Sequence, residues 1–122
     1  MKKVLVIEDD AFLLSVYQAK MQQVQLDFRI AKDGEQAFSL LNEFQPDLIV
    51  LDLMIPKESG FDVLKKLKSE PKWQNIPVLV VSNLSQDEEK EKAKKLGAVD
   101  FFVKSEVNMQ EIIQRVEQLL GE

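Results

Sequence analysis

The chain has 122 residues, enough for one domain with a buried core, and hydrophobic residues make up 45% of it. It contains no Cys and no His, which excludes disulfides, thiolate or imidazole metal sites, and histidine as a general base. The formal net charge is −5, so we expect no nucleic-acid-binding surface. No apolar run approaches the roughly 20 residues of a membrane span, so we expect no membrane contact and a cytoplasmic location.

Short apolar runs alternate with segments of helical periodicity along the whole chain. In chain order, the predicted elements are strand 3–7, helix 11–24, strand 28–31, helix 33–44, strand 47–52, a helix beginning near residue 59, strand 77–82, helix 85–97, strand 99–103 and helix 107–120. Two of these helices are predicted to begin with a capping box, formed by Asp33 with Gln36 and by Ser85 with Glu88.

This alternation of strands and helices predicts a parallel sheet with helices on both faces. The strands at 3–7, 47–52 and 77–82 are almost entirely apolar, as expected for strands that are covered on both faces. We therefore expect a single α/β domain over residues 1–122, with a flavodoxin-like, doubly wound (βα)5 fold and a five-stranded sheet of order 2-1-3-4-5. The order is chosen from the common doubly wound arrangements, because the sequence itself does not set it.

Acidic residues follow two strands that would be neighbours at the centre of this sheet. Glu8, Asp9 and Asp10 follow the first strand, and Asp52 ends the third. Asp10 is most simply the N-cap of the first helix. An ionised carboxylate left unpaired inside a buried strand is costly, so Asp52 needs a strong partner or lies at the strand's end, where a site opens. In doubly wound sheets, ligands bind at that edge.

The residue types at this edge suit the binding of a phosphoryl group. Carboxylates that converge repel one another, and a divalent cation relieves the repulsion; oxygen ligands without His or Cys favour Mg²⁺. Ser82 ends the fourth strand and supplies a hydroxyl, while Lys104 follows the fifth and supplies a positive charge. Asp52 could act as a nucleophile that forms an aspartyl phosphate. The alternative is a purely structural ion pair between Asp52 and Lys104.

Four stretches, VLVIEDD, DLIVLDLMIP followed by Gly60, PVLVVS and GAVDFFVK, occur in this order. Together they resemble, from end to end of the chain, the receiver domain of two-component response regulators, of the stand-alone, chemotaxis-regulator-like kind. The resemblance implies that Asp52 accepts a phosphoryl group from a sensor histidine kinase or a histidine phosphotransfer protein. It also implies that Asp52 and Asp9 bind Mg²⁺, that Glu8 does so through water, and that the backbone carbonyl of Met54 is a further ligand.

The resemblance further implies a conformational switch. Ser82 and Lys104 would contact the phosphoryl oxygens, and Phe101 would turn inward as Ser82 moves toward the phosphate. This coupling would change the surface made by the fourth helix, the fifth strand and the last helix. Because only Gly121 and Glu122 follow Leu120, we expect no output domain. The signal would then be passed on by docking to a downstream protein or by phosphorelay. We expect the protein to be a monomer or weak dimer and not a turnover enzyme.

Four positions near the expected site depart from the family or vary within it. Asn83 stands where the family usually has Ala or Gly, and Ser105 stands where it usually has Pro, often after a cis peptide bond. Asn83 would narrow access to the phosphoryl group or add a hydrogen bond to it. Met54 and Leu84 are apolar where some relatives carry groups that steer the attacking water, which predicts slow self-dephosphorylation.

Three other functions are weighed against this one. A phosphatase of the haloacid-dehalogenase type has its nucleophile after the first strand and a second Asp two residues on, where this chain has Met54 after Asp52. A flavodoxin-like cofactor binder needs a Ser/Thr/Gly-rich loop after the first strand, where EDDAF is acidic. A phosphorylation-independent, receiver-like interaction scaffold is the remaining alternative, and Asn83 and Ser105 keep it open.

Overall fold

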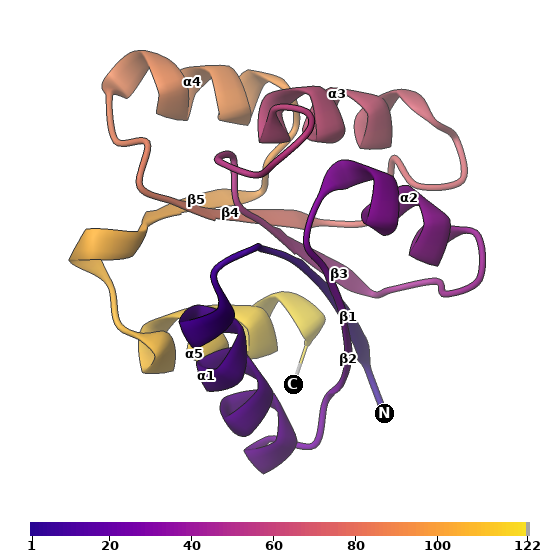
Figure 1. Ribbon diagram of the computed structural model, residues 1–122, viewed down its shortest axis with the longest axis vertical. Helices are drawn as coiled ribbons and strands as arrows, with labels where there is room; N and C mark the ends of the chain where they lie inside the picture. The colour runs from indigo at the N-terminus through magenta and orange to yellow at the C-terminus, as the bar shows by residue number, and fades with distance from the viewer. Residues whose placement is uncertain (122) are drawn as a thin grey trace.

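Five strands lie parallel to one another in the computed structural model, which describes residues 1–121 (Figure 1). In chain order they are β1 (Lys3–Ile7), β2 (Asp27–Ala31), β3 (Leu48–Leu51), β4 (Val78–Ser82) and β5 (Asp100–Val103). Hydrogen bonds join them in the order β2-β1-β3-β4-β5, which confirms the predicted doubly wound α/β fold and its strand order. Glu122, the last residue of the expected domain, lies outside the described residues.

The helices cover both faces of the sheet. They are α1 (Ala11–Gln23), α2 (Gly34–Leu41), α3 (Gly60–Ser69), α4 (Asp87–Lys95) and α5 (Met109–Leu120), with a short 3₁₀ turn at Lys104–Glu106. Figure 1 shows α1 and α5 on one face and α2, α3 and α4 on the other. Each face has its own apolar cluster, and β1, β3 and β4 contribute alternate side chains to both clusters. Within residues 1–121, no helix combines the length and the apolar character needed to cross a bilayer.

The N-terminus of α4 differs from the prediction. Gln86, not Ser85, is the N-cap, and its capping box is completed by Glu89 rather than Glu88. The expected box is therefore wrong by one residue. The sequence has a polar residue followed three positions later by Glu at both registers, and the observed one places Asp87, Glu88 and Glu89 in the first turn. Acidic residues there interact favourably with the helix dipole.

The first turn of α5 also lies later than predicted. The helix begins at Met109 rather than at Val107, because the 3₁₀ turn at Lys104–Glu106 separates it from β5. Asn108 is the N-cap: its side chain accepts a hydrogen bond from the Glu111 backbone N–H (2.9 Å), and Glu111 accepts one from the Asn108 N–H (3.2 Å). This capping box sets where the helix starts.

The capping box predicted for α2 forms only in part. The Asp33 side chain accepts a hydrogen bond from the Gln36 backbone N–H (2.8 Å), as expected. The Gln36 side chain, however, accepts from the N–H of Lys32 (2.9 Å) rather than from that of Asp33. The helix ends at Leu41, before the predicted end at residue 44.

Candidate functional site

Asp52 lies just beyond the buried strand β3, at the carboxyl edge of the sheet. The strand ends at Leu51, which is paired with Ile7 at the end of β1, so the next residues, Asp52 and Glu8, come from adjacent strands. The Asp52 backbone N–H donates to the Ile7 carbonyl (3.0 Å) and fixes the two strand ends together. A carboxylate therefore follows this apolar run because the strand stops there and a polar site begins.

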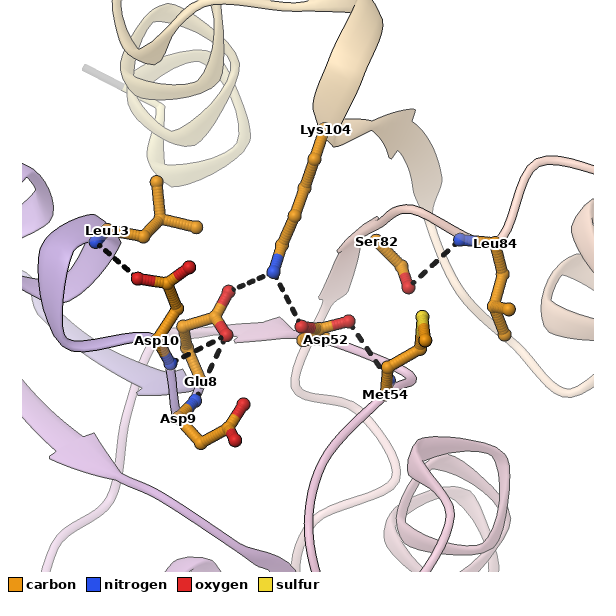
Figure 2. Close-up of polar contacts among 9 residues, drawn as sticks. All are labelled: Glu8, Asp9, Asp10, Leu13, Asp52, Met54, Ser82, Leu84 and Lys104. Carbon is orange, nitrogen blue, oxygen red and sulfur yellow. Dashed lines mark hydrogen bonds and ion pairs between the residues drawn. The ribbon is translucent and has the colours of Figure 1, made fainter.

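Lys104 joins the two buried carboxylates (Figure 2). Its Nζ lies 2.6 Å from Glu8 Oε1 and 2.6 Å from Asp52 Oδ2. The Glu8 and Asp52 side chains are only 3% and 4% exposed, and that of Lys104 is 18% exposed. A pair between Lys104 and Asp52 was an expected alternative. The contact of Lys104 with Glu8 was not expected, because the sequence carries no separate signal for it.

The other oxygens of these carboxylates accept backbone hydrogen bonds. Glu8 Oε2 accepts from the N–H groups of Asp9 (3.0 Å) and Asp10 (3.2 Å). Asp52 Oδ1 accepts from the N–H of Met54 (3.0 Å). Both buried carboxylates are thus held in fixed orientations by their own loops. The Asp10 side chain instead caps α1, as expected, by accepting from the Leu13 N–H (3.1 Å).

Burial and neighbouring charges together shift the pKa values of three groups in the site, Glu8, Lys104 and Tyr17. Burial raises the pKa of Glu8 above its ordinary value; the hydrogen bond from Lys104 opposes this rise, and the charge of Asp52 adds to it. Burial by itself would lower the pKa of Lys104, but its hydrogen bonds to Asp52 and Glu8 and their negative charges outweigh burial and raise it. Burial, with the charges of Glu8 and Asp52, also raises the pKa of Tyr17. Lys104 therefore stays positively charged at neutral pH.

The acidic residues fit a hard divalent cation. Glu8, Asp9 and Asp52 each offer a carboxylate oxygen, and these oxygens lie within 4.8 Å of one another. Three negative charges against the single positive charge of Lys104 leave an excess that a divalent cation would balance. Asp9 is exposed, whereas Glu8 and Asp52 are buried, so the cluster opens to solvent on the Asp9 side. Oxygen ligands with an open side suit Mg²⁺, which keeps several waters.

Ser82 and Phe101 lie on the neighbouring strands β4 and β5. Ser82 is fully buried at the end of β4, and its Oγ accepts a hydrogen bond from the Leu84 N–H at 3.4 Å (Figure 2). Phe101 is half-buried on β5 and packs against the apolar cluster under α2, α3 and α4. The strand pairing places Phe101 beside Val80, two residues before Ser82. The residues of the predicted switch are thus close in the sheet.

Met54, Asn83 and Leu84, which the sequence singled out near the expected site, are all at least partly exposed. The Met54 side chain is 56% exposed and Asn83 is exposed, whereas Leu84 is half-buried. In Figure 2 the Met54 side chain is drawn to the right of the Asp52 carboxylate and below Ser82. All peptide bonds among residues 1–121 are trans, including the one before Ser105, which lies in the 3₁₀ turn.

Gly60 has a role that its sequence position alone does not reveal. Its N–H donates to the Leu53 carbonyl (3.0 Å), and this brings its Cα close to the chain after β3. A Cβ added to Gly60 would lie 2.6 Å from the Asp52 carbonyl oxygen and would also overlap the Leu53 backbone. Only glycine permits this approach, which shapes the loop that follows Asp52.

Comparisons with known proteins identify relatives of this arrangement. The family profile described as "Response regulator receiver domain" matches residues 4–117. The chain is 34% identical over 120 residues to the "DNA-binding dual master transcriptional regulator RpaA" of Synechocystis sp., an alignment that covers 98% of this chain and 49% of that protein. It thus spans about half the length of the first curated relatives that it matches.

Two solved structures are similar over nearly the whole chain. The Francisella response regulator 1452 receiver domain is 33% identical, with a TM-score of 0.90 and coverage of 99% of this chain and 98% of that one. The "Mn(2+)-bound form of response regulator Rcp1" is 25% identical, with a TM-score of 0.84 and coverage of 98% of this chain and 91% of that one.

Proposed function

This chain belongs to the response regulator receiver domain family, and we propose that Asp52 is the residue that accepts a phosphoryl group. One observation carries the proposal. Asp52 is buried at the end of β3, bound to Lys104 at 2.6 Å, and within 4.8 Å of the ligand oxygens of Glu8 and Asp9. A buried carboxylate with a cation on one side and acids on the other is placed as a nucleophile beside a metal site.

The donor is a phosphorylated histidine of a sensor histidine kinase or of a histidine phosphotransfer protein. A carboxylate oxygen of Asp52 forms a bond to phosphorus while the bond from phosphorus to the histidine nitrogen breaks, and the imidazole leaves with that electron pair. Lys104 provides positive charge for the phosphoryl oxygens, and Ser82 provides a hydroxyl donor. Both groups lie at the same edge of the sheet as Asp52.

The cofactor we propose is Mg²⁺, which Asp9 and Asp52 would hold, together with Glu8 through water and the backbone carbonyl of Met54. The oxygen-only donor set supports this assignment, as does the similarity to Rcp1, which was solved in a form with bound Mn²⁺. When bound, Mg²⁺ would neutralise charge on the phosphoryl oxygens. In this structure the Lys104 ammonium contacts both buried carboxylates, so Lys104 and a bound Mg²⁺ would share them.

Phosphorylation would act as a switch rather than as a step in substrate turnover. Ser82 would move toward the phosphoryl group, Phe101 would turn inward, and the surface of α4, β5 and α5 would change. This surface would then bind a downstream protein, or Asp52 would pass its phosphoryl group on. We assign no nucleic-acid contact to these residues, whose net charge is −5, although RpaA is named as a DNA-binding regulator. The setting we propose is the cytoplasm, with the domain a monomer or weak dimer.

Phosphorylation by acetyl phosphate tests the proposal. The protein is incubated with and without Mg²⁺, beside the variants Asp52→Asn and Asp62→Asn, and its intact mass is measured. Asp62 is an exposed acid on α3, so Asp62→Asn makes the same chemical change away from the site. We expect one phosphoryl adduct that requires Mg²⁺, persists in Asp62→Asn and is absent from Asp52→Asn. No adduct in any sample would instead favour the phosphorylation-independent scaffold.

A further inference from the structure

The loop between β3 and α3 contains a residue in an unfavourable backbone conformation. Lys57 has φ = 74°, in the left-handed region, which side chains with a Cβ rarely adopt. Among residues 1–121, Gln25 is the other non-glycine residue with a positive φ. The Lys57 conformation must therefore be held by contacts that the loop makes with its surroundings.

The Lys57 side chain makes two of these contacts, both to the start of α2. Its Nζ lies 3.0 Å from Glu35 Oε2 and 3.5 Å from Asp33 Oδ2. Asp33 is the N-cap of α2, and its side chain is 8% exposed, so its position is fixed by the helix. Lys57 thus ties the tip of the loop to the N-terminus of a packed helix.

Glu58 makes a further contact with the same helix end. A side chain on Gly34, the first residue of α2, would collide with the Glu58 carboxylate and with Val63. Glycine at position 34 therefore lets Glu58 lie against the helix N-terminus, where the helix dipole favours a negative charge. The tip of the loop is fixed at Lys57 and Glu58.

The base of the same loop is fixed at the phosphoacceptor. The Met54 N–H donates to Asp52 Oδ1 (3.0 Å), and the Gly60 N–H donates to the Leu53 carbonyl (3.0 Å). The Met54 N–H is thus part of the fixed base, whereas its carbonyl belongs to the stretch that runs on to Lys57, three residues later. The orientation of its carbonyl therefore depends on both ends of the loop.

We propose that Lys57 is a positioning residue for the metal site. By tying the loop to Asp33 and Glu35, it keeps the strained backbone in place and directs the Met54 carbonyl toward Mg²⁺ beside Asp52. This inference rests on the proposed function, because it assumes that Mg²⁺ binds there. Without the two ion pairs, the loop keeps its Glu58 contact and the hydrogen bonds at its base, but the left-handed residue is held less firmly and the carbonyl is less well oriented.

Calorimetric titration with Mg²⁺ alone tests this role in the unphosphorylated protein. The variants are Lys57→Ala, Lys57→Arg and Lys65→Ala, of which the last removes the same charge from an exposed position on α3. Loss of a positive charge should by itself strengthen binding of a cation. We expect Lys57→Ala to do the opposite and weaken Mg²⁺ binding about two- to fivefold. This is the change in affinity that corresponds to the free energy of an exposed ion pair. Lys57→Arg should retain the wild-type affinity.

A double-mutant cycle separates positioning from charge. Glu35→Gln should weaken Mg²⁺ binding less than Lys57→Ala does. The double variant with both substitutions should bind Mg²⁺ about as well as Lys57→Ala alone, because the two residues share one ion pair. Equal affinities for wild type and Lys57→Ala would overturn the positioning role alone. If the wild type binds no Mg²⁺, the proposed metal site fails, and this inference fails with it.

Discussion

Replacing Lys104 by Met removes the cation between two buried carboxylates. The side chains of Glu8 and Asp52 are 3% and 4% exposed, and each lies 2.6 Å from Lys104 Nζ. Removing one partner of a buried ion pair costs about 3–5 kcal/mol, because it leaves an uncompensated charge. Lys104 is 18% exposed, so water screens part of the interaction and we take about 3 kcal/mol. For a domain of this size, this lowers Tm by about 10–15 °C.

The loss of stability should depend on pH in a defined direction. Burial already raises the pKa of Glu8 above 4.5 in the folded protein, and loss of Lys104 raises it further. A carboxyl group with a higher pKa in the folded than in the unfolded protein binds its proton more tightly in the folded state. The free energy of unfolding therefore falls as the pH rises from the pKa of the unfolded state through that of the folded state. The Tm difference between Lys104→Met and wild type should therefore be smaller near about pH 5 than near about pH 8.

Thermal unfolding followed by circular dichroism measures this effect. Both proteins are compared in EDTA and in Mg²⁺, with Lys65→Met as a control that loses an exposed lysine. Mg²⁺ should raise the Tm of Lys104→Met more than that of wild type, because the cation no longer competes with an ammonium for the carboxylates. If the Tm of Lys104→Met in EDTA at pH 8 lies within about 2 °C of wild type, this reasoning is refuted, because two buried carboxylates without a cation between them must destabilise the fold.

Three further predictions concern the same edge of the sheet. Gly60→Ala places a Cβ 2.6 Å from the Asp52 carbonyl oxygen, so urea unfolding should show a loss of about 1–3 kcal/mol; an unchanged midpoint would contradict the close packing. Glu8→Gln removes a carboxyl group whose pKa is raised in the folded protein, and ionising that group near about pH 8 costs stability. In EDTA, the Tm of Glu8→Gln should therefore exceed that of wild type near about pH 8 and should vary less with pH. A lower Tm would show that ionised Glu8 is net stabilising. Met54→Asn replaces an apolar, exposed side chain two residues after Asp52 by a polar one, so the phosphoryl half-life of the purified protein should shorten; equal half-lives would remove the prediction of slow dephosphorylation.

The strands and helices of the fold follow from the sequence because hydrophobic periodicity is a local signal that packing preserves, whereas the strand order was chosen from the common doubly wound arrangements. The apolar run at Leu48–Leu51 is buried on both faces, as its composition requires. Helix starts are less certain because neighbouring residues can offer the same spacing to a Glu, and the intrinsic preference for Ser as an N-cap does not decide between them. Ser85 and Gln86 both precede a Glu by three positions, and only the folded chain shows that Gln86 is the cap.

The residues of the candidate site that directly follow strands could be predicted from the sequence. Glu8 and Asp52 converge because parallel strands end at the same edge of the sheet, and the sequence identifies those ends. Contacts between distant segments gave no such signal. The bond from Lys104 to Glu8 and the tie from Lys57 to α2 depend on how loops far apart in the sequence meet.

Mapping the phosphoryl group to a single residue is the decisive test of the proposed phosphoacceptor. The protein is incubated with acetyl phosphate and Mg²⁺, and borohydride then reduces any acyl phosphate, which converts a phosphorylated aspartate into homoserine. Fragmentation of the peptide that contains Asp33, Asp47 and Asp52 identifies the modified residue by mass. We expect homoserine at position 52 alone, and only when Mg²⁺ was present. Homoserine at another aspartate, or equal conversion in EDTA, would contradict the assignment of Asp52 beside a Mg²⁺ site.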